Sequence, residues 1–132
     1  MKDSSKPSVQ PSEKPFVFVV DDEPLLLELA STLLASTCRV KTFERPDEAC
    51  RAFADANPRP DLLITDFAMH NMNGMELIVE CRRIQPDQKI LLLSGTVDES
   101  VYRDSPVKPN HFMAKPYRSR DFLALVQTLL AG

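Results

Sequence analysis

Short apolar runs alternate along the chain with longer stretches in which apolar residues recur at helical spacing. The clearest runs, Phe16–Val20 and Lys89–Leu93, are apolar almost throughout. Such runs are typical of strands that are covered on both faces of a parallel sheet. We therefore predict five strands, over residues 16–20, 39–43, 61–66, 89–93 and 111–114.

Between most of the predicted strands, apolar residues follow the spacing of an amphipathic helix. Pro24 and Pro46 suit the first turns of two helices, and Asn73 with Glu76 three residues later resembles a capping box. The predicted helical stripes are Leu25, Leu26, Leu29 and Leu33; Ala49, Ala52, Phe53 and Ala56; Leu77, Ile78, Cys81 and Ile84; and Phe122, Leu125, Val126 and Leu129.

The segment between the fourth and fifth strands is the exception. Only Val97, Val101 and Tyr102 suggest a turn or two of helix before Pro106 and Pro109 interrupt it. We expect a fourth helix that is short, displaced or disordered.

Strands that alternate with helices form βαβ units, which build a right-handed parallel sheet with helices on both faces. The chain has 132 residues, which is enough for one domain. Residues 1–15 are rich in Ser, Pro and Lys and predict a disordered tail. We therefore predict an α/β domain over residues 16–132, with a doubly wound five-stranded parallel sheet.

Composition excludes several classes of protein. A net charge of −3 provides no broad basic face, so nucleic acid is not expected as a direct partner. No apolar stretch approaches the roughly 20 residues of a membrane span, so no membrane association is expected. The 3 cysteines form no CxxC pair, which favours a reducing cytoplasm. The 3 glycines cannot build a P-loop or a GxGxxG turn.

Reactive side chains follow four of the predicted strands. In open α/β sheets, ligand sites lie beyond the carboxyl ends of the strands. If these strands are neighbours, three carboxylates, a hydroxyl and an ammonium converge there: Asp21, Asp22, Asp66, Ser94 and Lys115.

This combination of groups indicates phosphoryl chemistry. Crowded carboxylates repel one another unless a cation is present, and their hard oxygen atoms suit Mg²⁺. Lys115 could hold the carboxylates together without the metal. With Mg²⁺ bound, a carboxylate can attack a phosphoryl group whose oxygens are neutralised by the metal and the lysine. The Ser94 hydroxyl could donate a hydrogen bond to one of those oxygens.

Five segments together resemble the receiver domain of two-component response regulators, the phospho-acceptor module of bacterial signalling. They occur in the family's order and spacing and are distributed over residues 16–132: Val19–Glu23, Asp61–Met69, Met72–Leu77, Leu93–Gly95 and Lys115–Tyr117. The resemblance implies a flavodoxin-like fold with strand order 2-1-3-4-5.

The resemblance also implies how phosphorylation would occur. Asp66 would accept a phosphoryl group from a histidine kinase or a phosphotransfer protein, forming an acyl phosphate. Asp22 would ligate Mg²⁺ directly, together with Asp66, and Asp21 would do so largely through water. The backbone carbonyl of Ala68 would be a further ligand.

Other matching residues would carry the response to phosphorylation. Ser94 would shift toward the phosphoryl group and Lys115 would pair with it. Phe112 lies where the family has its aromatic rotamer switch, and the bond between Lys115 and Pro116 is usually cis in the family.

The chain departs from the family pattern in two places. His70 replaces the usual proline, and we expect a changed loop conformation without a catalytic consequence. The alternative is that His70 contacts the phosphoryl pocket or tunes hydrolysis. Ser105–Asn110 replaces the usual Gly-Ala end of the fourth helix, which puts the family's standard output surface in doubt.

The leading interpretation is a receiver that is phosphorylated on Asp66 and signals to an unknown downstream protein by protein–protein contact. It would be no enzyme beyond Mg²⁺-dependent self-phosphorylation and slow self-dephosphorylation. A degenerate receiver that acts as a constitutive binding module, or a phosphate sink or relay intermediate, stays open as an alternative. A haloacid-dehalogenase-like phosphohydrolase is disfavoured, because Ala68 stands where that class needs a second Asp.

Overall fold

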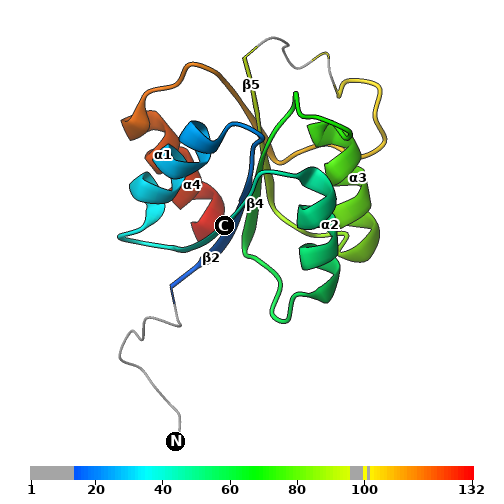
Figure 1. The fold of residues 1–132 in the computed structure, drawn as a ribbon, viewed down its shortest axis with the longest axis horizontal. Helices are drawn as coiled ribbons and strands as arrows, with labels where there is room; N and C mark the ends of the chain where they lie inside the picture. The colour runs from blue at the N-terminus through cyan, green and yellow to red at the C-terminus, as the bar shows by residue number, and fades with distance from the viewer. Residues whose placement is uncertain (1–13, 96–99, 101) are drawn as a thin grey trace, which may run out of the picture.

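The computed structural model describes residues 14–95, 100 and 102–132, and its strands form one parallel sheet (Figure 1). The strands are β2 (Phe16–Val20), β3 (Arg39–Phe43), β4 (Leu62–Asp66), β5 (Ile90–Ser94) and β6 (His111–Ala114). Their spatial order is β3-β2-β4-β5-β6. Counted along the chain, this is the predicted order 2-1-3-4-5, so the predicted fold class is confirmed.

Helices cover both faces of the sheet. They are α1 (Pro24–Leu34), α2 (Pro46–Asp55), α3 (Gly74–Ile84) and α4 (Ser119–Ala131). α1 and α4 lie on one face, and α2 and α3 lie on the other (Figure 1). The predicted capping box is present at the start of α3, where Asn73 and Glu76 each accept a backbone N–H from the other. Among the described residues, no helix has both the length and the apolar character needed to cross a membrane.

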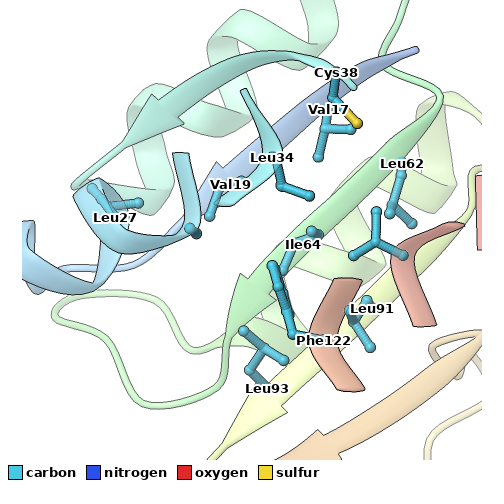
Figure 2. Close-up of a cluster of buried hydrophobic side chains, with 12 residues drawn as sticks. Val17, Val19, Leu27, Leu34, Cys38, Leu62, Ile64, Leu91, Leu93 and Phe122 are labelled. Carbon is cyan, nitrogen blue, oxygen red and sulfur yellow. The ribbon is translucent and has the colours of Figure 1, made fainter. Parts of the chain in front are cut away.

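Alternate side chains of the strands form two hydrophobic cores. Val17 and Val19 of β2 face α1 and α4, where Phe122 is fully buried (Figure 2). Phe18 and Val20 face α2 and α3 and pack in the second cluster. This arrangement explains why the strands are apolar at nearly every position, since both faces of the sheet are covered.

The predicted apolar stripe of α1 is wrong at two of its four positions, while Leu33 of the stripe packs against the core. The helix buries Leu27, Ala30 and Leu34 against the sheet. Leu25 and Leu29 of the predicted stripe are instead exposed, by 79% and 44% respectively. Because the helix contains leucines on several sides, helical spacing alone fits two different faces.

Two expectations fall wholly or partly outside the described residues. The predicted tail lies mainly in residues 1–13, which the structure does not describe. The expected short fourth helix involves residues 96–99 and 101, which are also not described. Nearby, Ser105 donates its backbone N–H to the carbonyl of Tyr102 in a turn. The helix labelled α4 is the last helix of the chain, and it lies where the sequence predicts it.

Candidate functional site

The carboxyl ends of four neighbouring strands bring the predicted site residues to one edge of the sheet. The register aligns Val20 with Thr65, and Asp66 with Leu93. Asp21 directly follows β2, and its backbone N–H donates to the carbonyl of Phe43 in β3. Parallel pairing therefore places residues that are distant in sequence beside one another.

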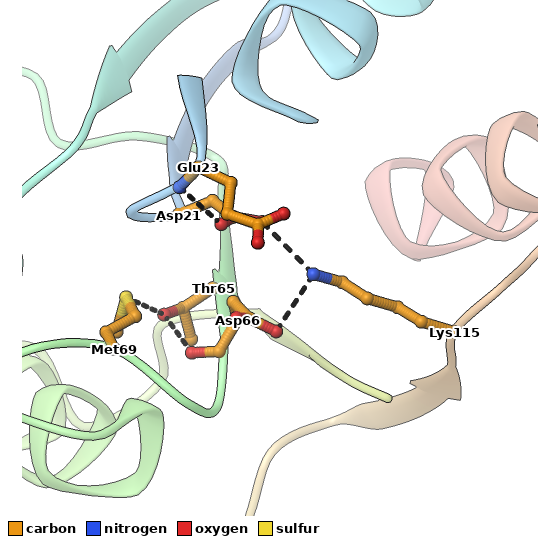
Figure 3. Close-up of polar contacts among 6 residues, drawn as sticks. All are labelled: Asp21, Glu23, Thr65, Asp66, Met69 and Lys115. Carbon is orange, nitrogen blue, oxygen red and sulfur yellow. Dashed lines mark hydrogen bonds and ion pairs between the residues drawn. The ribbon is translucent and has the colours of Figure 1, made fainter. Parts of the chain in front are cut away.

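Lys115 connects two of the carboxylates (Figure 3). Its Nζ lies 3.1 Å from Oδ2 of Asp21 and 3.0 Å from Oδ1 of Asp66. The side chains are only 19%, 6% and 11% exposed, so the three charges interact with little solvent between them. The backbone N–H of Lys115 donates to the carbonyl of Ser94, which fixes the start of this side chain.

Burial and neighbouring charges shift the pKa values of Asp66 and Lys115 in opposite directions. Burial raises the pKa of Asp66, and the hydrogen bond and charge of Lys115 only partly offset this effect. Burial lowers the pKa of Lys115, but the hydrogen bond that its ammonium donates to Asp66 and the charges of Asp21 and Asp66 outweigh it and raise the pKa above its usual value. Lys115 is therefore a stable cation, while Asp66 is a carboxylate whose ionisation is costly.

The acidic cluster has the chemistry of a divalent-cation site. One carboxylate oxygen from each of Asp21, Asp22 and Asp66 lies within 4.8 Å of the other two. Hard oxygen donors at this spacing fit a small cation such as Mg²⁺, which commonly retains several waters and takes few carboxylates. Asp21 is also held by a hydrogen bond from the backbone N–H of Glu23 to Oδ1, at 3.0 Å (Figure 3).

Two residues to which the sequence assigned no role lie against the backbone carbonyl of Asp66. The hydroxyl of Thr65 donates to the Asp66 carbonyl at 2.9 Å (Figure 3). A Cβ on Gly74 would clash with that same carbonyl and would lie 2.9 Å from Cδ1 of Leu92. The only sequence signals were a hydroxyl residue within an apolar strand and a glycine at the start of α3.

The remaining predicted site residues lie on β5, on β6 and in the loop after Asp66. Ser94 is buried at the end of β5, and Ala68 is exposed two residues beyond Asp66. Phe112 is half-buried in β6, with its ring centroid 6.3 Å from that of Tyr102. The bond between Lys115 and Pro116 is cis, as the resemblance implied.

His70 contacts the acidic cluster, which is the alternative that the sequence left open beside a changed loop conformation. Its Nδ1 is 2.8 Å from Oδ2 of Asp22, and its backbone N–H donates to the same oxygen at 3.2 Å. Asn71, the next residue, has a φ of 73°, so the chain turns sharply here. The sequence offered a contact with the phosphoryl pocket as an alternative but did not identify Asp22 as the partner.

The sequence pattern of one protein family matches residues 17–127, and its description is "Response regulator receiver domain". The chain belongs to this family. Its function is that of a receiver in two-component signalling, and the receiver is a signalling domain.

Two curated relatives are similar to this receiver. One is the transcriptional regulatory protein GlrR of Escherichia coli, which is 34% identical over 94 residues, covering 68% of this chain and 21% of GlrR. The other is the response regulator protein VraR of Staphylococcus aureus, which is 25% identical over 118 residues, covering 88% of this chain and 56% of VraR. The chain thus spans about a fifth and about half of these relatives.

Solved receiver domains share the fold. The non-phosphorylated HemR receiver domain of Leptospira biflexa matches with a TM-score of 0.80 and 21% identity, and the match covers 90% of this chain and 96% of that chain. At this identity, the likeness shows the fold of the receiver.

Proposed function

We propose that this receiver accepts a phosphoryl group on Asp66 in a Mg²⁺-dependent reaction. The observation that carries the proposal is the position of Asp66, whose carboxylate contacts Lys115 and belongs to the cluster with Asp21 and Asp22. A purely structural carboxylate has no need of two further acids beside it, because each raises the cost of ionising the others.

The proposed transfer is a displacement at phosphorus. A carboxylate oxygen of Asp66 attacks the phosphorus of a phosphohistidine, a P–O bond forms and the P–N bond breaks. The histidine nitrogen leaves with the electron pair and is protonated, and Asp66 holds an acyl phosphate. The ammonium of Lys115, 3.0 Å from Asp66, is placed to neutralise the transferred oxygens. Hydrolysis of the acyl phosphate by water returns the free carboxylate, so the domain undergoes slow self-dephosphorylation.

Four groups would hold the metal. The carboxylates of Asp22 and Asp66 would bind it directly, Asp21 would bind it largely through water, and the backbone carbonyl of Ala68 would supply a further oxygen. When bound, Mg²⁺ neutralises charge on the phosphoryl oxygens and on the crowded carboxylates.

Ser94 and Phe112 would convert phosphorylation into a change of shape. Ser94 ends the strand beside Asp66, so a small shift would bring its hydroxyl to a phosphoryl oxygen. Phe112 pairs with Leu92 on β5 and packs near Tyr102, so a change at Ser94 reaches an aromatic pair at the protein surface. This surface would then contact a downstream protein.

The phosphoryl donor would be a histidine kinase or a phosphotransfer protein, and it must approach Asp66 from outside the sheet edge. Beside Lys115 lies a hollow of about 400 Å³ lined by apolar side chains of α1, including Leu26 and Leu29, and by Tyr117. Leu25, the residue before Leu26 in α1, is 79% exposed. An apolar surface next to the acceptor supports docking of the donor here.

A small P–N donor tests the chemistry without a kinase. The wild-type chain is incubated with phosphoramidate and Mg²⁺ and is compared with Asp66→Asn by intact-mass spectrometry. We expect one phosphoryl adduct on the wild type, and no adduct when the metal is chelated before the donor is added. We also expect no adduct on Asp66→Asn. A folded wild-type protein that binds Mg²⁺ but gains no phosphoryl group would contradict the proposal.

A further inference from the structure

Two donors from one residue meet a single oxygen of Asp22. The imidazole Nδ1 of His70 lies 2.8 Å from Oδ2, and the backbone N–H of His70 donates to Oδ2 at 3.2 Å. A carboxylate oxygen accepts about two hydrogen bonds, so these contacts occupy Oδ2. Within the described part of the chain, no hydrogen bond to Oδ1 accompanies them. Oδ1 is therefore the oxygen that stays available to a cation.

The imidazole lies outside the set of potential metal ligands. Among the described residues, the donor atoms that come within 4.8 Å of one another belong to Asp21, Asp22 and Asp66, and no atom of His70 is included. The His70 side chain is also 89% exposed, whereas that of Asp22 is 17% exposed. His70 thus contacts the cluster from its outer side, through Asp22.

We propose that His70 is a positioning residue that orients the Asp22 carboxylate for the metal. The inference rests on the proposed function, because it takes Asp22 as a Mg²⁺ ligand. By holding Oδ2, His70 restricts rotation of the carboxylate and directs Oδ1 to the site. Hydrogen-bonding partners that orient a metal ligand typically contribute 10- to 100-fold to metal affinity.

The design of the test follows from the position of the donor atom. His70→Asn retains an N–H donor at the δ position, but its side chain has no counterpart of the imidazole Nε2. His70→Ala removes the side-chain donor altogether. Both variants retain the backbone N–H. His111→Ala is the matched control, because His111 is the other histidine and is exposed at the start of β6.

Metal binding is measured directly as the loss of the free Mn²⁺ signal in electron paramagnetic resonance, and Mg²⁺ affinity is measured by displacement of Mn²⁺. We expect His70→Ala to weaken binding of both ions about tenfold. His70→Asn is expected to recover most of the loss, and His111→Ala to match the wild type. Circular dichroism checks that each variant is folded.

Three results would overturn the inference, and they differ in what they say about the proposed function. Wild-type affinity in His70→Ala would leave the metal site intact and remove the role of His70. Failure of His70→Asn to recover binding, with a greater loss for Mn²⁺ than for Mg²⁺, would make His70 a direct ligand. A wild-type chain that binds neither ion would contradict both the inference and the proposed metal dependence.

Discussion

The ammonium of Lys115 lies 3.0 Å from Oδ1 of Asp66, although the two residues leave different strands of the sheet. The same ammonium lies 3.1 Å from Asp21, so one cation balances two buried carboxylates. Removing the cation would leave the negative charge of both carboxylates without compensation. A bound metal ion would supply positive charge in its place, and protonation would remove part of the negative charge.

Lys115→Met is therefore expected to lower the free energy of unfolding at neutral pH by about 2 kcal/mol, less than for a fully buried pair because some solvent reaches the site. The loss should shrink at acidic pH, where the carboxylates are protonated, and on addition of Mg²⁺. Urea unfolding at several pH values measures both effects. Lys41→Met, at an exposed lysine of β3, is the control. An equal loss at every pH would point to lost packing instead of charge.

Any side chain at Gly74 should destabilise the folded chain. A Cβ there would clash with the backbone carbonyl of Asp66 and lie 3.0 Å from Cα of Phe67. We expect Gly74→Ala to lower the free energy of unfolding by about 1–3 kcal/mol and to slow phosphorylation, because the acceptor strand must move. At Gly95 a Cβ would meet only Cβ of Lys115, at 3.5 Å, so Gly95→Ala should be nearly neutral. Equal effects of the two substitutions in urea unfolding would refute this explanation.

The stability of the chain should depend on pH through Asp66. Burial raises the pKa of this carboxyl in the folded chain above the ordinary value of 3.8. Asp66 therefore adds to the free energy of unfolding at pH values below the ordinary pKa, and this contribution is lost as pH rises through the folded pKa. Asp66→Asn removes this titration, so it should gain stability relative to the wild type as pH rises from about 4 toward neutrality. A difference that stays constant across this range in urea unfolding would contradict the raised pKa.

Leu25 should matter for phosphoryl transfer between proteins and not for folding. Because its side chain is 79% exposed, Leu25→Glu should change the free energy of unfolding by no more than about 0.5 kcal/mol. Leu27→Ala, at a buried position of the same helix, should cost about 2–5 kcal/mol.

The same Leu25→Glu variant should be phosphorylated normally by phosphoramidate. Transfer from a histidine kinase that phosphorylates the wild type should be slower, since the donor protein would dock on α1. Rapid-quench measurement of both reactions distinguishes docking from chemistry. Equal slowing with the small donor would place the effect at Asp66 instead.

The sheet and the acidic cluster could be predicted because their signals are local or topological. Apolar strands indicate burial on both faces, and parallel order then brings Asp21, Asp66 and Lys115 to one edge. The buried face of α1 could not be predicted, because its leucines fit two helical stripes. Packing against the sheet selects Leu27 and Leu34.

The details around Asp66 depend on the path of the loop that follows it. The sequence offered a contact of His70 with the phosphoryl pocket only as an alternative, because the loop path that brings His70 to Asp22 is not encoded in residue spacing. The close approach of Gly74 to the Asp66 carbonyl likewise arises from the entry of α3, not from residue spacing.

The central claim is that the phosphoryl group resides on Asp66. Phosphoramidate-treated protein is reduced with borohydride, which converts an aspartyl phosphate to homoserine, and the peptides are mapped by tandem mass spectrometry. We predict homoserine at position 66 alone, dependent on Mg²⁺. Homoserine at Asp21 or Asp22, or a phosphoryl group retained on His70, would contradict the assignment.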